Sequence, residues 1–138
     1  MNKFDVSAIA LAIGLAFGTG AMANSLSKEE YKAQKEGISA EYRSDKAVCG
    51  SFAANAKEYI CNAEAEGKEK VANAALEALY RPTPQTRYDA RVAKADAAFA
   101  VAKERCDDHG NAKDACVKEA KAARTTARAD AKAQFGKS

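Results

Sequence analysis

Apolar and small residues recur every three or four positions along most of this chain. The clearest series consists of Tyr88, Val92, Ala95, Phe99, Ala102 and Cys106. This spacing places the side chains on one face of an α-helix. No stretch of the sequence alternates with the period of two residues that is typical of a half-buried strand. The pattern therefore predicts an all-α chain, with helices over residues 27–49, 55–80, 84–108 and 112–134.

The other predicted helices carry weaker stripes. In the first, Lys35 and Asp45 interrupt a series made by Tyr31, Ile38, Tyr42 and Cys49. The second is lined by Ala56, Ile60, Ala63, Val71, Ala74 and Ala78. The fourth is lined by Cys116, Ala120, Ala123, Ala127 and Ala131. Since most of these residues are alanine, we expect a thin core that benefits from covalent cross-links or from a partner.

Polar residues at the predicted helix ends fit known capping motifs. Ser27 and Glu30 have the spacing of a capping box at the start of the first helix. Asn55 is placed as the N-cap of the second helix. Gly110 predicts a helix stop, and Asn111 after it predicts a new N-cap.

The sequence contains an internal repeat. Tyr31, Tyr42 and Cys49 match Tyr88, Phe99 and Cys106 at a constant offset of 88 − 31 = 57 in sequence number, and Cys61 matches Cys116 at an offset of 116 − 61 = 55. Because small length changes are tolerated at turns, the change in offset predicts a turn between the paired cysteines. We expect two tandem antiparallel helical hairpins, over about 27–81 and 84–135. They form either a four-helix bundle or an extended array, with coiled-coil-like heptad spacing.

The first residues have the features of a signal peptide. Lys3 precedes an apolar run over residues 6–17, and Ala21 and Ala23 match an A-x-A cleavage pattern. The run is shorter than the roughly 20 residues that a membrane-spanning helix needs. We therefore predict a signal peptide over 1–23, cleavage after Ala23, and an exported, periplasmic all-α domain over 24–138.

Four cysteines in an exported chain indicate disulfides. An antiparallel hairpin brings the ends of its helices together, which favours the pairs Cys49–Cys61 and Cys106–Cys116. The alternative is a metal-binding or stress-related protein that uses the cysteines with His109. Zinc sites usually contain closely spaced cysteine pairs, which this chain lacks. The sequence shows no nucleophile–base pair either, so we expect a non-enzymatic protein without metal or cofactor.

The formal net charge is only +3, which does not indicate a specific nucleic-acid binder. One basic series recurs at helical spacing near the C-terminus: Lys118, Lys121, Arg124, Arg128 and Lys132. Such a helix face can bind an anionic polymer or lipid, although weakly. A solvent-exposed face without a ligand is the simpler interpretation of the same residues.

The chain resembles small Ala/Lys-rich exported proteins of proteobacteria, which are often labelled TolA-like cell-envelope proteins. The resemblance is in the N-terminal leader, in the Asn-Ala-Lys runs that precede Cys61 and Cys116, and in Glu119-Ala120-Lys121. It implies a periplasmic helical spacer and assigns no functional residue. We expect a structural or protein-interaction role in the cell envelope, through envelope proteins or self-association. Binding to an anionic surface and metal handling are the alternatives.

Overall fold

The computed structural model describes residues 26–52, 55–135 and 137. The predicted signal peptide and its cleavage after Ala23 lie outside the described residues. Over the described part the chain is all-α, without strands, as the sequence pattern predicts. The elements are α1 (Lys28–Cys49), α2 (Ala56–Tyr80), α3 (Pro84–Cys106), the short 3-10 helix η1 (Asp107–Ala112) and α4 (Lys113–Phe135).

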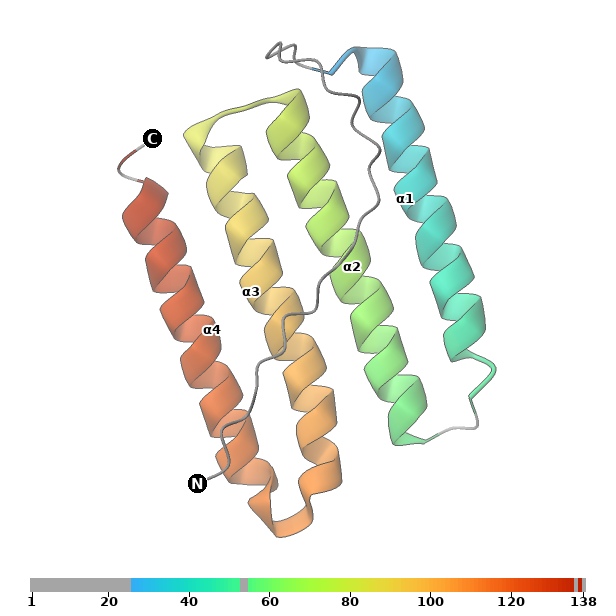
Figure 1. The fold of residues 1–138 in the computed structure, drawn as a ribbon, viewed down its shortest axis with the longest axis vertical. Coiled ribbons are helices and arrows are strands. Elements are labelled where there is room, and N and C mark those ends of the chain that lie inside the picture. Colours follow the sequence, from blue (N-terminus) through green and yellow to red (C-terminus); the bar gives the residue numbers. More distant parts are fainter. Residues whose placement is uncertain (1–25, 53–54, 136, 138) are drawn as a thin grey trace, which may run out of the picture.

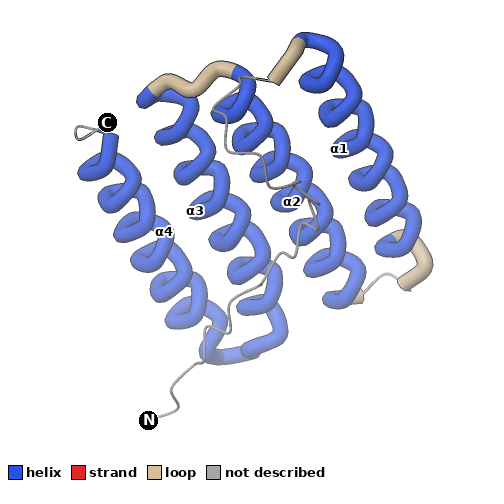
Figure 2. The backbone as a smooth tube through the Cα atoms, turned by 45° about the horizontal axis from the view of Figure 1, so that its top comes forward, coloured by secondary structure: helices blue, strands red, loops and turns tan. Residues whose placement is uncertain are grey.

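The helices lie side by side in a single layer, in the order α1, α2, α3 and α4 (Figures 1 and 2). Consecutive helices run in opposite directions, and each packs against its neighbour in the chain. The contact between α2 and α3 is the most extensive, and that between α1 and α2 is the smallest of the three. No substantial contact between described elements joins α1 to α4, as a closed bundle would require. The layer is therefore open, with α1 and α4 at its two edges.

The helix ends follow the capping signals, with one exception. The Ser27 hydroxyl accepts a hydrogen bond from the backbone N–H of Glu30, whose carboxylate accepts one from the backbone N–H of Ser27, at 3.1 and 2.8 Å. Gly110 has a φ of 52° and a ψ of −120°, a non-helical conformation that suits a residue without a Cβ atom, and it interrupts the helical path there. The prediction of an N-cap at Asn111 is wrong. Asn111 lies inside η1 with helical backbone angles, so it lacks the extended conformation that a capping residue has.

Close packing of α2 on α3 depends on Gly67. A Cβ atom at this position would lie 3.0 Å from the Cβ atom of Ala97, which is tighter than ordinary side-chain contacts. Gly67 is buried. Val71, one turn after Gly67 on α2, and Val101, one turn after Ala97 on α3, are buried as well. The mid-helix glycine therefore allows two helices with small side chains to approach each other.

Few side chains are fully buried in this layer. The buried apolar residues are Cys49, Ala65, Val71, Leu76, Ala95, Val101, Cys106 and Ala131. The predicted stripe of α4 is partly wrong, because Ala123 and Ala127 are exposed and Arg124 is half-buried. Alanine occurs on every side of α4, so its spacing does not identify the packed face. The long side chain of Arg124 covers α3 there instead.

Candidate functional site

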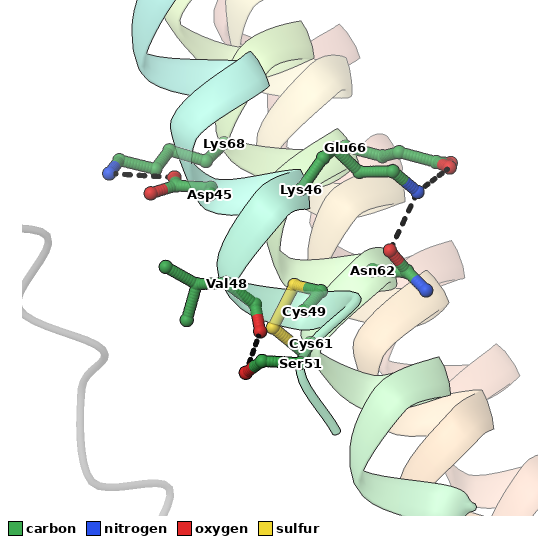
Figure 3. Close-up of a disulfide and its surroundings, with 9 residues drawn as sticks. All are labelled: Asp45, Lys46, Val48, Cys49, Ser51, Cys61, Asn62, Glu66 and Lys68. Atoms are coloured by element: carbon green, nitrogen blue, oxygen red, sulfur yellow. Dashed lines mark hydrogen bonds and ion pairs between the residues drawn. A yellow bond between two sulfur atoms is a disulfide. The ribbon is translucent and has the colours of Figure 1, made fainter. Parts of the chain in front are cut away.

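Both disulfides expected from the sequence are present. Cys49–Cys61 joins the end of α1 to the first turns of α2 (Figure 3), with the Cα atoms 5.4 Å apart. Cys106–Cys116 joins the end of α3 to the start of α4 across η1, with the Cα atoms 5.6 Å apart. Because all four cysteines are oxidised, none is a free thiolate that could bind a metal.

Each disulfide-linked pair of helices has an aromatic pair at the end opposite its disulfide. Tyr31 at the start of α1 stacks on Tyr80 at the end of α2, with ring centroids 4.3 Å apart. Tyr88 at the start of α3 packs edge-on against Phe135 at the end of α4, at 5.5 Å. The offsets in sequence number are 88 − 31 = 57 and 135 − 80 = 55, the same as those of the cysteines. The two aromatic pairs are therefore equivalent positions of the internal repeat.

Polar side chains join α1 to α2 on both sides of the first disulfide (Figure 3). On one side, the Lys68 ammonium forms ion pairs with Glu41 and, at 3.2 Å, with Asp45. The hydrogen bond to Glu41, with support from Asp45, raises the pKa of Lys68 above its usual value. On the other side, Lys46 donates to the Asn62 side-chain oxygen at 2.6 Å. These contacts add to the limited apolar packing between α1 and α2.

Two side chains of the basic series on α4 form ion pairs within the chain. Arg124 and Arg128 both reach Asp96 on α3, with nitrogen–oxygen distances of 2.7 and 3.1 Å. The Arg124 guanidinium also lies over the Phe99 ring, 5.0 Å from its centroid. Two of the five predicted polyanion-binding residues therefore form part of the α3–α4 contact. The other three, Lys118, Lys121 and Lys132, are exposed.

A groove of about 280 Å³ lies along the contact between α2 and α3, and we call it the α2–α3 groove. Small residues form part of its lining: Ala63, Gly67, Ala97 and Ala100. Three carboxylates also line it, from Glu66 on α2 and from Asp96 and Glu104 on α3, together with the ammonium of Lys70. The groove is open to solvent, a shape that suits a surface contact better than an enclosed small molecule. Two of its carboxylates already have partners within the chain, Asp96 with Arg124 and Arg128 and Glu66 with Lys46 at 3.9 Å.

The chemistry available in the described part of the chain is limited. His109 lies exposed in η1, where the sequence places it in a turn. Among the described residues, no three His, Cys, Asp or Glu side chains gather closely enough to hold a metal ion. Over the same residues, no helix is long and apolar enough to cross a membrane.

Comparison with protein-family models, with curated proteins and with solved structures finds no match for this chain. Sequence reasoning missed two residues that shape the α2–α3 groove. The sequence pattern does not single out Asp96, because one carboxylate between apolar positions looks like any exposed residue. Gly67 lies in the middle of a predicted helix, and a glycine at that place could have indicated a close helix approach.

Proposed function

We propose that this protein is a non-enzymatic, periplasmic helical protein with a structural or protein-interaction role in the cell envelope. The observation that carries the proposal is the single open layer of helices. In a closed bundle each helix hides one face in a common core, whereas here both sides of α2 and α3 face solvent between the contacts with their neighbours. Broad helical surfaces of this kind suit binding to another macromolecule.

We further propose that the layer is built from two copies of one antiparallel helical hairpin. The support comes from the paired offsets in sequence number, 88 − 31 = 57 on the first helix and 116 − 61 = 55 on the second, which relate both the disulfides and the aromatic pairs. Each copy is fixed by a disulfide at its turn and by two aromatic rings at its open end. Such a unit keeps its helices in register with little buried apolar surface.

Export is part of the proposal. Disulfides persist in oxidising compartments such as the periplasm, and the predicted leader over residues 1–23 fits the same route. The resemblance to TolA-like exported proteins supports a place in the envelope. The test is the intact mass of the protein recovered from a periplasmic fraction, which we expect to begin after Ala23 and to lack four thiol hydrogens. Recovery of the uncleaved chain with the membranes would contradict export.

The interaction role is tested by photocrosslinking in cells. A photoreactive amino acid replaces Tyr59 at the α2–α3 groove, or Leu79 at the far end of α2, where the side chains are 59% and 50% exposed. We expect a discrete crosslinked product of defined mass at one position and much less at the other. If neither position gives a product in cells that export the chain, the interaction role is wrong.

A further inference from the structure

We propose that two copies of this chain associate face to face, with the basic side of α4 in each copy lying over the α2–α3 groove of the other. The proposal rests on the interaction role proposed above and names its partner. The occupant of the groove is therefore a second copy of the same chain, held by opposite charges that each copy carries on one side of its layer.

The groove and the basic series lie on the same side of the layer. Asp96 lines the α2–α3 groove and also accepts the ion pairs from Arg124 and Arg128 of α4. Lys121 precedes Arg128 by seven residues, and Lys132 follows it by four. At this spacing both lysines fall on the same side of α4 as Arg128. One side of the molecule therefore carries a groove lined by the carboxylates of Glu66 and Glu104 and, next to it, a helix with the exposed ammonium groups of Lys121 and Lys132.

The internal repeat inverts the charge between these two elements. At the offset that relates Cys61 to Cys116, the α4 series corresponds to Ala63, Glu66, Glu69, Asn73 and Glu77 of α2. Lys121 thus stands where α2 has Glu66 (121 − 66 = 55), and Lys132 stands where α2 has Glu77 (132 − 77 = 55). At three of these five positions the two repeat copies carry opposite charges, which is the pattern expected of surfaces that meet.

The direction of the helices permits both contacts at once. α2 and α4 run the same way through the layer (Figure 1). A two-fold axis parallel to the helices and above the side of α3 that faces α4 therefore places α4 of one copy along the groove of the other, and the reverse contact follows by symmetry. This is an isologous arrangement, the commonest one in homodimers. It places Lys121 near Glu66 of the other copy, and the small residues Ala63 and Ala100 leave room for a helix to approach.

The test is sedimentation equilibrium of the full chain, as the producing cell processes it, at low salt. We expect the weight-average mass of the wild type to rise toward twice the monomer mass. Lys121→Glu and Glu66→Lys should each weaken dimerisation by about tenfold, since each reversal acts at two symmetric sites. An equimolar mixture of the two variants should recover dimers close to wild-type affinity, because both contacts in the mixed dimer pair opposite charges again.

The matched control is Lys94→Glu, which reverses an exposed lysine of α3 outside the groove and should leave dimerisation unchanged. Circular dichroism checks that each variant keeps its helices. A wild type that stays monomeric overturns the proposal, even if it binds anionic vesicles, and failure of the mixture to recover dimers does so as well. In-cell crosslinking to a different protein, together with a monomeric wild type, would preserve the interaction role and remove only the second copy as its partner.

Discussion

The Cβ atom of Ala97 on α3 lies 3.0 Å from the place that a Cβ atom would take at Gly67 on α2. Gly37 sits near the middle of α1 and has no atom within 4 Å of the corresponding place. The two glycines therefore have the same helical context and different surroundings. One permits a helix–helix contact, and the other only weakens its helix.

This difference predicts opposite effects of the same substitution. Gly37→Ala should raise the free energy of unfolding by about 0.5–1 kcal/mol, because alanine loses less backbone entropy on folding. Gly67→Ala should lower it by about 1 kcal/mol, since the added methyl group pushes α2 away from Ala97. Urea unfolding followed by circular dichroism measures both values. Equal stabilisation by the two substitutions would show that α2 and α3 leave room for a methyl group at Gly67.

The disulfides should contribute substantially to stability because the core is thin. They join residues 12 and 10 positions apart. The chain-entropy model gives roughly 2.5–3 kcal/mol for loops of this length. We expect replacement of Cys106 and Cys116 by serine to lower the free energy of unfolding by about this amount, and replacement of Cys49 and Cys61 to do likewise. A thermal unfolding midpoint unchanged in either double variant would contradict a stapling role.

Asp96 should stabilise the contact between α3 and α4. Asp96→Asn leaves Arg124 and Arg128 without their carboxylate, and we expect a loss of about 1 kcal/mol in unfolding free energy, since the side chains are partly exposed. The control is Asp130→Asn, which changes an exposed carboxylate of α4 and should stay within about 0.5 kcal/mol of the wild type. The loss at Asp96 should also shrink in high salt, which screens ion pairs.

The contact between Tyr31 and Glu77 predicts a loss of stability at alkaline pH. The Tyr31 hydroxyl donates to the Glu77 carboxylate at 2.9 Å, and this hydrogen bond raises the pKa of Tyr31 above its ordinary value. A raised folded-state pKa contributes stability that is present below the ordinary tyrosine pKa and is lost as pH rises through the raised value. Denaturant unfolding between pH 8 and 11 should show a steeper decline for the wild type than for Tyr31→Phe. Parallel curves would exclude this contribution.

Local signals in the sequence identified most of the helical framework. The capping box at Ser27, the glycine stop at Gly110 and the cysteine pairing depend on short-range spacing, so they could be read without the fold. The packed face of α4 could not be identified from the sequence, because alanine on every side of the helix leaves several stripes of equal quality. The basic series likewise gave no sign that Arg124 and Arg128 bind Asp96, since that contact depends on which side of α3 faces α4.

The choice between a bundle and an extended array could not be derived from the sequence for a related reason. Both arrangements use the same helices, turns and disulfides, and they differ only in whether α1 meets α4. That contact would be decided by side chains on the outer faces of the two edge helices. Those faces carry small residues such as Ala40 and Ala122, which are compatible with burial and with exposure.

The distance between α1 and α4 tests the open layer most directly. Spin labels attached through encoded ketone side chains at Ser39 and Thr125 leave the disulfides intact, and excess unlabelled protein removes distances between copies. With neighbouring helix axes about 8–10 Å apart, three spacings in a row predict α1 and α4 to be about 24–30 Å apart. Double electron–electron resonance measures the distance between the two labels, and a distance that corresponds to this helix separation would support the layer. A helix separation of only about one such spacing, about 8–10 Å, would mean that α1 packs on α4 in a closed bundle, which would contradict the open layer.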